Sequence, residues 1–334
     1  MGLTALQGVT AAIVNFNTRD QLSRCLESLE PERLASIIVV DNASSDGSAE
    51  MARQYASVRV LANSTNIGYG AAANQALRAA RTKYLLLLNA DTEVRPGASE
   101  LLARYLDAHP AVAVAAPRLE NPDGSRQLSC FPFPGTLGWL CDHGPLAVFS
   151  RHVPAARERS ITFQTGLDPR PVPWALGAAL LLRREAVLEV DGFDESYFMY
   201  FEEVDLAYRL ARAGWRTHVV PDAVVMHVGA ASTSQVRRTM LVQRFRSTRD
   251  YYRRHATGIT QMFWIAMLCT RWAARLVRDS ARLLLTLDAG RRHQLRSDLS
   301  AWWTALFERR VQQVPTRSTR RIDAASKQRA DGSV

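Results

Sequence analysis

Residues 36–47 read Ser-Ile-Ile-Val-Val-Asp-Asn-Ala-Ser-Ser-Asp-Gly. The β-branched run predicts a buried strand over 36–40, and the polar residues after it predict a turn with Asp46 as the N-cap of a helix over 47–56. Similar short apolar runs and amphipathic segments predict strands at 11–15, 58–61, 84–88 and 112–116, and helices at 20–30, 70–81 and 96–108, the last with Pro96 at its first position. Strands alternating with helices indicate an α/β fold, a mostly parallel sheet covered on both faces.

Polar side chains follow three of these strands, and ligands of such sheets bind beyond the carboxyl ends of the strands. Asn15 and Asn17 come after the first strand, Asp41 after the second, and Asp91 after the run of four leucines. We therefore expect one polar edge suited to a nucleotide and a metal. Asp91 could ligate Mg²⁺ or Mn²⁺, which prefer oxygen, and Asp41 could accept a hydrogen bond from a pyrimidine ring. A turn or cap role is equally open for Asp91, and the turn sequence after Asp41 by itself favours a turn role for that residue.

The second half of the chain adds an acidic cluster and a histidine. Residues 117–175 predict loops that lead to an acceptor region, followed by a strand over 175–182, a helix over 204–213 closed by Gly214, and a strand over 215–220. Glu202, Glu203 and Asp205 at the helix start are candidates for the general base that an attacking hydroxyl needs, although acids there also suit the helix dipole alone. His227 is a candidate metal ligand or phosphate donor, or a structural histidine.

The net charge of +10 is unevenly distributed. Residues 1–236 carry 21 Lys/Arg and 25 Asp/Glu, or −4, and residues 237–334 carry 21 and 7, or +14. A predicted amphipathic helix over 259–287 places four arginines on one face and supplies apolar surface from Trp264, Leu268, Trp272, Leu276 and Leu283. The uncharged run 259–270 is too short to span a bilayer.

This basic segment predicts contact with an anionic membrane surface, and packing on the catalytic domain is the alternative. No nucleic-acid motif accompanies the charge, so we expect no nucleic-acid partner. We expect a catalytic domain over 1–236 (nucleotide half 1–116, acceptor half 117–236), a basic helical extension over 237–312 and a disordered tail over 313–334. Without a secretory signal in residues 1–10, we expect a cytoplasmic protein, peripheral on the inner face of the plasma membrane.

One competing motif is present: residues 68–73, Gly-Tyr-Gly-Ala-Ala-Ala, match the dinucleotide fingerprint G-x-G-x-x-A. The glycines of that fingerprint should follow a strand at once, whereas here six residues intervene after Leu61. The motif is therefore a weak indication of a dehydrogenase.

Taken in chain order, the motifs at 12–17, 40–47, 66–74, 88–92, 174–178, 200–205 and 227–229 resemble those of family-2 glycosyltransferases with the GT-A fold. The resemblance covers roughly residues 8–255 and is greatest to bacterial rhamnosyltransferase-type members. It implies a Rossmann-like sheet and inverting, metal-dependent transfer from a dTDP- or UDP-sugar, with dTDP-L-rhamnose favoured. The implied acceptor is a glycan or polyprenyl-linked glycan in cell-surface polysaccharide assembly. A nucleotidyltransferase shares the sheet and the metal but fits the acidic cluster less well.

The resemblance also implies roles for individual residues. Asn89 replaces the first aspartate of the family's D-x-D motif, which leaves Asp91, with His227, to hold Mg²⁺ or Mn²⁺. Glu203 stands at the catalytic base, with Asp205 and Glu202 as the other candidates. Contacts to the donor sugar and acceptor are implied for Trp174, Gly177 and Ala178. Nucleotide contacts are implied for Val14, Asn15, Asn17, Asp41, Asn66, Gly68, Asn74, Asn89 and Ala90.

Overall fold

The computed structural model describes residues 6–135, 168–229, 237–285 and 288–307. Its centre is a ten-stranded sheet in the order β3-β2-β1-β4-β11-β6-β12-β5, with β7 added beside β6 and β9 beside β12. The strands are β1 Val9–Asn15, β2 Ser36–Asp41, β3 Val58–Ala62, β4 Tyr84–Asn89, β5 Thr92–Val94, β6 Val112–Glu120, β7 Arg126–Gln127, β9 Arg170–Val172, β11 Ala179–Arg183 and β12 Arg216–His227. A separate two-stranded sheet pairs β8 Cys130–Phe131 with β10 Trp174–Ala175.

The predicted α/β architecture is confirmed, but the sheet also contains antiparallel strands, since β5 and β9 run antiparallel to β12 and β7 runs antiparallel to β6. Strands β3, β2, β1 and β4 are parallel, and β12 is parallel to β6. Between these two groups, β11 runs antiparallel to both β4 and β6. Strand β11 therefore joins the group β3, β2, β1 and β4 to the group β6, β12 and β5. The carboxyl ends of β1 and β4 lie near this junction.

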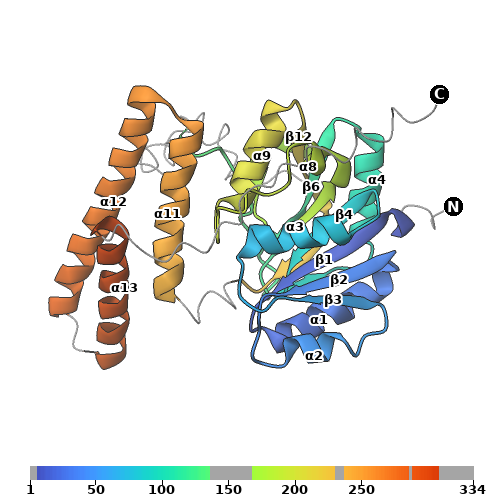
Figure 1. Ribbon diagram of the computed structural model, residues 1–334, viewed down its shortest axis with the longest axis horizontal. Helices are drawn as coiled ribbons and strands as arrows, with labels where there is room; N and C mark the ends of the chain where they lie inside the picture. Colours follow the sequence, from blue (N-terminus) through green and yellow to red (C-terminus); the bar gives the residue numbers. More distant parts are fainter. Residues whose placement is uncertain (1–5, 136–167, 230–236, 286–287, 308–334) are drawn as a thin grey trace, which may run out of the picture.

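Helices cover both faces of the sheet (Figure 1). Because side chains alternate along a strand, Leu86 and Leu88 pack on one face with α1 Arg19–Leu29, α2 Ser48–Ala52 and α4 Ala98–Ala108. Leu85 and Leu87 pack on the other face with α3 Tyr69–Ala79, α8 Arg184–Glu189 and α9 Glu202–Arg212. A strand buried on both faces explains the uninterrupted leucines of β4.

Two helices lack the start that the sequence predicts for a clear structural reason. The N-cap of α2 is Gly47, in the left-handed region at φ +81°, and the Asp46 carboxylate instead accepts the N–H groups of Arg19 (2.9 Å) and Ser48 (3.0 Å). The fourth helix begins at Ala98 rather than at Pro96. Its first N–H groups are capped by the distant Glu32 carboxylate, which no local pattern reveals.

Three helices follow β12: α11 Arg237–His255, α12 Gly258–Leu285 and α13 Ala289–Phe307. In Figure 1, α11 lies between the sheet and the outer pair α12–α13. Their core is aromatic, with the rings of Trp272 and Trp302 4.4 Å apart in a T-shaped contact. Trp264, Leu268 and Trp272 are buried in this core, so the expectation that they provide a membrane-facing surface is wrong. None of the described helices is long and apolar enough to span a bilayer, and the predicted tail over 313–334 lies outside the described residues.

Candidate active site

A cavity of about 460 Å³ opens at the carboxyl ends of β1 and β4, where the sequence places the polar edge. Its wall combines both halves of the sheet with the loop before α9 and the first turn of α11. Most of the predicted site residues line it: Val14, Asn15, Asn66, Gly68, Asn89, Ala90, Asp91, Gly177, Ala178, Glu202, Glu203 and His227. Segments more than two hundred residues apart in the chain thus converge on one pocket.

Asp91 and His227 face each other on this wall. The carboxylate Oδ1 and the imidazole Nε2 are 3.4 Å apart, and both side chains are 9% exposed. The other ring nitrogen, Nδ1, lies 2.8 Å from Oε1 of Gln127, whose own Nε2 donates to Asn121. This arrangement favours a proton on Nδ1 and leaves the Nε2 lone pair pointing toward Asp91.

The chemistry of this pair fits a divalent cation. Two acceptor atoms 3.4 Å apart repel each other unless a cation or proton lies between them. Carboxylate oxygen suits Mn²⁺ and Mg²⁺, and imidazole nitrogen is a common ligand of transition-metal ions. Within the described residues no group of three or more His, Cys, Asp or Glu side chains forms a complete metal site. The protein would therefore supply two ligands and leave the remaining positions to a diphosphate and water, as is usual for Mg²⁺.

Glu202 and Glu203 lie at the start of α9 and line the cavity, Glu202 buried and Glu203 half-buried. Each has one carboxylate oxygen, Oε2, without a hydrogen-bond partner among the described residues. Burial, and then the charge of Glu203, raises the pKa of Glu202 well above its ordinary value. Burial also raises the pKa of Glu203, but backbone N–H groups, that of Gly177 among them, oppose the rise. Glu202 therefore retains its proton more readily, and Glu203 is the better place for the negative charge.

The peptide of Gly177 is held against Glu203 by a neighbouring tyrosine. Tyr69 Oη donates to the Gly177 carbonyl at 2.9 Å. A Cβ on Gly177 would lie 3.5 Å from Cβ of Glu203, in ordinary van der Waals contact, so the two backbones approach closely. On the other side, Tyr200 and Phe201 have positive φ values of +67° and +72°, an uncommon conformation for large residues that marks strain at functional sites. These contacts orient the start of α9 toward the cavity.

The remaining five predicted site residues do not line the cavity. Asp41 is 2% exposed, and its carboxylate accepts hydrogen bonds from Asn15 (2.8 Å) and Ser44 (2.9 Å). Asn17 accepts from Ser45 on the same rim. The others are held elsewhere by the protein: Asn74 bridges to Phe193 and Glu195, Trp174 donates to the Pro132 carbonyl, and Asp205 binds Arg209 and His255.

The cavity also includes residues that the sequence did not single out: Phe16, Asn42, Tyr69, Leu176, Phe198, Met199, Tyr200, Thr239 and Met240. Tyr69 and Leu176 stand inside the quoted motifs and could have been found there. Thr239 and Met240 belong to α11, and no local pattern connects that helix to the site. Gln127 escaped notice because a lone glutamine in a loop carries no signal.

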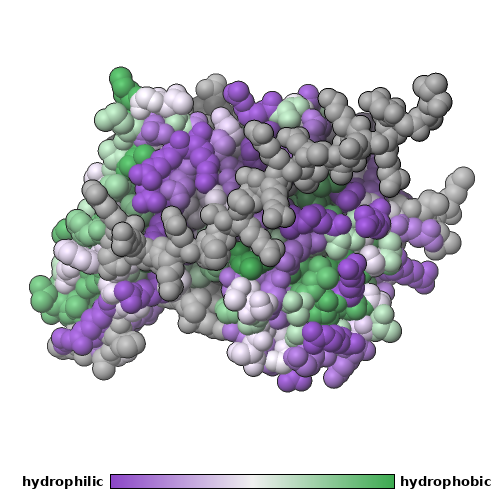
Figure 2. Space-filling model, viewed as in Figure 1, coloured by the Kyte–Doolittle hydropathy of each residue, from purple (hydrophilic) through white to green (hydrophobic). Residues whose placement is uncertain are grey.

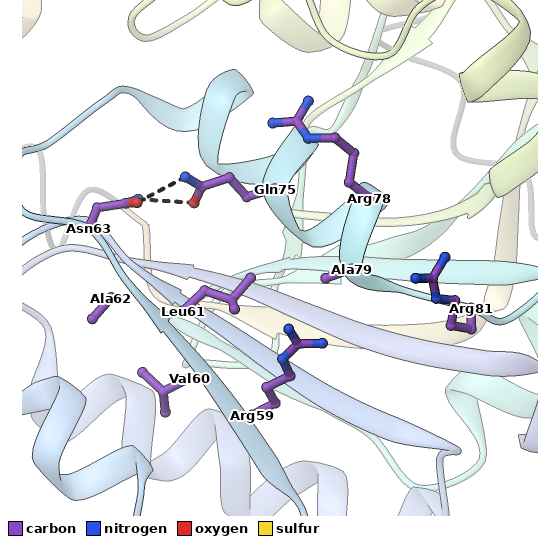
Figure 3. A pocket seen from close by; sticks show the side chains of 9 residues that line it. All are labelled: Arg59, Val60, Leu61, Ala62, Asn63, Gln75, Arg78, Ala79 and Arg81. Atoms are coloured by element: carbon purple, nitrogen blue, oxygen red, sulfur yellow. Dashed lines mark hydrogen bonds between the residues drawn. The ribbon is translucent and has the colours of Figure 1, made fainter. Parts of the chain in front are cut away.

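A second depression of about 660 Å³ lies apart from this site, on the edge strand β3 and α3, and is wide open to solvent (Figure 3). Figure 3 shows Arg59, Arg78 and Arg81 around it, with the reciprocal hydrogen bonds between Asn63 and Gln75 at one end. It contains none of the predicted site residues. A charged side chain on an edge strand discourages pairing with other chains, which accounts for Arg59 of β3.

Comparison with known proteins identifies the family. The model "Glycosyl transferase family 2" matches residues 10–153, and "Glycosyl transferase family group 2" matches residues 151–307. N-acetylglucosaminyl-diphospho-decaprenol L-rhamnosyltransferase of Mycobacterium tuberculosis is 32% identical over 302 residues, which cover 85% of this chain and 95% of that protein. The chain belongs to glycosyltransferase family 2.

Other relatives of this family-2 glycosyltransferase agree. Rhamnosyltransferase WbbL of Escherichia coli is 27% identical over 64% of the chain and 81% of its own length. Among solved structures, the mannosyltransferase PcManGT from Pyrobaculum calidifontis, in complex with GDP-Man and Mn²⁺, has a TM-score of 0.53 at 16% identity and covers 91% of this chain and 88% of its own. GalNAc-T7 with UDP, GalNAc and Mn²⁺ has a TM-score of 0.50 at 18% identity over 66% and 43%. The predicted GT-A fold and family are confirmed, and the dehydrogenase and nucleotidyltransferase alternatives are set aside.

Proposed function

We propose that the chain transfers a sugar with inversion from a pyrimidine nucleoside diphosphate donor, favoured as dTDP-L-rhamnose, to a hydroxyl of a glycan on a polyprenyl diphosphate. The M. tuberculosis relative is named for L-rhamnosyl transfer to N-acetylglucosaminyl-diphospho-decaprenol, and the E. coli relative is also named as a rhamnosyltransferase. Such an acceptor would place the activity in the assembly of a cell-surface polysaccharide.

The observation that carries the proposal is Glu203 in the wall of the cavity, with a buried carboxylate oxygen, Oε2, that has no hydrogen-bond partner among the described residues. Inversion in a single displacement needs a base that accepts the proton of the attacking hydroxyl. Glu203 combines a free acceptor atom with a pKa raised by burial, which makes its carboxylate a stronger base than an exposed one. Its neighbour Glu202 holds its own proton more firmly, so we assign the negative charge that a base needs to Glu203.

Asp205 takes a positioning role in this proposal. It is 1% exposed, and its two oxygens accept hydrogen bonds from Arg209 (2.6 Å) and His255 (2.7 Å). These contacts lower the pKa of Asp205 in spite of the opposing effect of burial. A carboxylate whose two oxygens are both engaged, one by Arg209 and one by His255, is a weak base, so Asp205 fixes α9 against α11 and does not take the proton.

Asp91 and His227 would hold the Mg²⁺ or Mn²⁺, and the ion would offset charge on the departing nucleoside diphosphate. The two solved structures that share the fold both contain Mn²⁺. In the protein, Gln127 keeps His227 in the required tautomer.

We assign the nucleotide to the rim formed by Val14, Asn15, Asn66, Gly68, Asn89 and Ala90. Asp41 would act on the pyrimidine through Asn15, which it holds by a 2.8 Å hydrogen bond, with Asn17 on the same rim. Gly177 and Ala178 would contact the donor sugar and acceptor. Trp174, outside the cavity, would hold the segment that contains Gly177 and Ala178 through its hydrogen bond to the Pro132 carbonyl. Asn74 would hold the loop before α9 through its hydrogen bonds to Phe193 and Glu195.

A donor screen by thermal denaturation tests the proposal. A ligand present at a hundred times its Kd adds about 2.7 kcal/mol to the free energy of unfolding. We expect stabilisation by dTDP or UDP in the presence of Mn²⁺, none by NAD, and loss of the metal-dependent part in Asp91→Asn. The matched control is Asp222→Asn, which removes an exposed aspartate from β12. A response to NAD alone, or a response that Asp91→Asn leaves intact, would refute the site.

A further inference from the structure

The outer face of α12 is apolar and exposed along its whole length. Eight of the twelve large hydrophobic side chains exposed in the described residues belong to α12 or α13. On α12 they include Ile259 (86% exposed), Met262 (72%), Val277 (70%) and Leu284 (85%). In Figure 2, green side chains follow the left edge of the molecule, where Figure 1 places α12.

These residues form one stripe, which we call the α12 stripe: Ile259, Met262, Phe263, Ala266, Thr270, Ala273, Val277, Ala281 and Leu284. At about 3.6 residues per turn these positions fall on one face, and the helix is about 42 Å long. The stripe contains no charged residue. The opposite face, with Trp264, Leu268 and Trp272, is the one buried against α11 and α13.

A row of arginines borders the stripe on one side. Arg271 and Arg278 lie between the stripe and the buried face, whereas Arg275 and Arg282 fall on the side of Trp264. The Arg275 guanidinium lies over the rings of Trp272 and Trp302. Arg278 and Arg282 contact Asp279. Arg271 and Arg275, together with the nearby Arg244 of α11, form no ion pair within the described part of the chain. Burial and the charges of the neighbouring arginines lower the pKa of both Arg271 and Arg275.

We propose that α12 docks on an anionic lipid bilayer, with the stripe inserted at the acyl boundary and the arginines against the lipid phosphates. A long uncharged stripe flanked by basic residues is the pattern of a helix that lies in the membrane interface. A second copy of the chain is a poor occupant by charge, because residues 237–307 carry 14 arginines against 4 aspartates, a net +10 that would face itself. This proposal depends on the proposed function in one respect only, the lipid-linked acceptor. Docking of α12 on the bilayer would bring that acceptor to the cavity.

Flotation of the full chain with vesicles tests this docking without any activity measurement. We expect binding to phosphatidylcholine vesicles that contain roughly a third of phosphatidylglycerol, and weak binding without the anionic lipid. Each arginine near such a surface changes the partition coefficient about fivefold, so Arg271→Gln/Arg275→Gln should lower it about 25-fold. Val277→Glu/Leu284→Glu should lower it at least about tenfold, because two charges would enter the acyl boundary. Leu101→Glu, at an exposed leucine on α4, is the matched control and should bind like the wild type.

Three results would overturn the proposal: no binding of the wild type to anionic vesicles, equal binding with and without anionic lipid, or full binding by Val277→Glu/Leu284→Glu. Size-exclusion chromatography tests whether a second copy of the chain occupies the stripe instead. A wild-type dimer that becomes a monomer in Val277→Glu/Leu284→Glu would identify the stripe as an interface between copies. Arg271, Val277 and Leu284 are exposed, so their replacement should not change the melting temperature. Arg275→Gln removes the contact with Trp272 and Trp302, so its melting temperature is measured beside its vesicle binding. Turnover of a water-soluble acceptor should also match the wild type, which separates failure of docking from failure of the proposed function.

Discussion

Replacing Asp205 with asparagine removes the anion at the centre of a buried group of three side chains. Loss of one partner from a buried ion pair costs about 3–5 kcal/mol, because the other charge stays buried. Arg209 is 26% exposed and still donates to the Gly192 carbonyl at 2.7 Å, so we expect the lower limit, about 3 kcal/mol. In a domain of this size each kcal/mol corresponds to about 2–4 °C, which predicts a melting temperature about 6–12 °C lower.

Glu203→Gln is the counterpart, with the opposite pattern. The glutamine fills the same space without a buried charge, so the melting temperature should stay or rise, while turnover falls at least about a hundredfold. Calorimetry and sugar transfer measured well below both melting temperatures separate the two effects. Asp205→Asn should retain turnover within about tenfold under those conditions, since it lacks the general-base role. A stable Asp205→Asn protein with a hundredfold lower turnover, or a Glu203→Gln enzyme of normal turnover, would refute the assignment of the base.

Three further outcomes follow from single contacts. Gln127→Leu removes the partner that orients His227 and should weaken Mn²⁺ binding about 10–100-fold in a titration, whereas unchanged affinity would exclude Gln127 from the metal site. Gly68→Ala places a Cβ 2.5 Å from the Phe198 carbonyl at φ +89° and should lower the free energy of unfolding in denaturant by about 2–4 kcal/mol. The control Gly97→Ala, at φ +83° in open space, should lower it by only about 1–2 kcal/mol. Folding raises the pKa of Glu202, so its contribution to stability is full below about pH 4.5 and declines as pH rises toward the folded pKa. Glu202→Gln should therefore flatten the fall of the unfolding free energy above that pH. Parallel curves of unfolding free energy against pH for the two proteins would contradict the raised pKa.

The sheet and most of the cavity wall could be predicted from sequence because local patterns determine them. The leucines of β4 and the polar residues after each strand identify the buried strand and the edge where ligands bind. The helical period also separates two of the candidate bases, because residues two apart on a helix do not share a face. Glu203 and Asp205 could therefore have been distinguished from sequence alone.

The failures come from contacts between distant segments. The cap of α4 is the Glu32 carboxylate, 65 residues away from Gly97 in the chain. A prediction based on Pro96 alone therefore placed the start of the helix two residues too early. On α12 two apolar stripes share one helix, and periodicity does not show which of them packs inward. The side chains of Trp264 and Trp272 took the inner position because α11 and α13 offer aromatic partners there.

The most direct measurement is sugar transfer to a polyprenyl-diphosphate-linked N-acetylglucosamine with Mn²⁺ present, comparing dTDP-L-rhamnose with UDP-hexoses. The product would be analysed by mass spectrometry for the added sugar and by NMR for the anomeric configuration. The account predicts addition of one deoxyhexose from dTDP-L-rhamnose, with an anomeric configuration opposite to that of the donor. Retention of configuration would contradict a single displacement with Glu203 as base, and no transfer from any of these donors would contradict the proposed function itself.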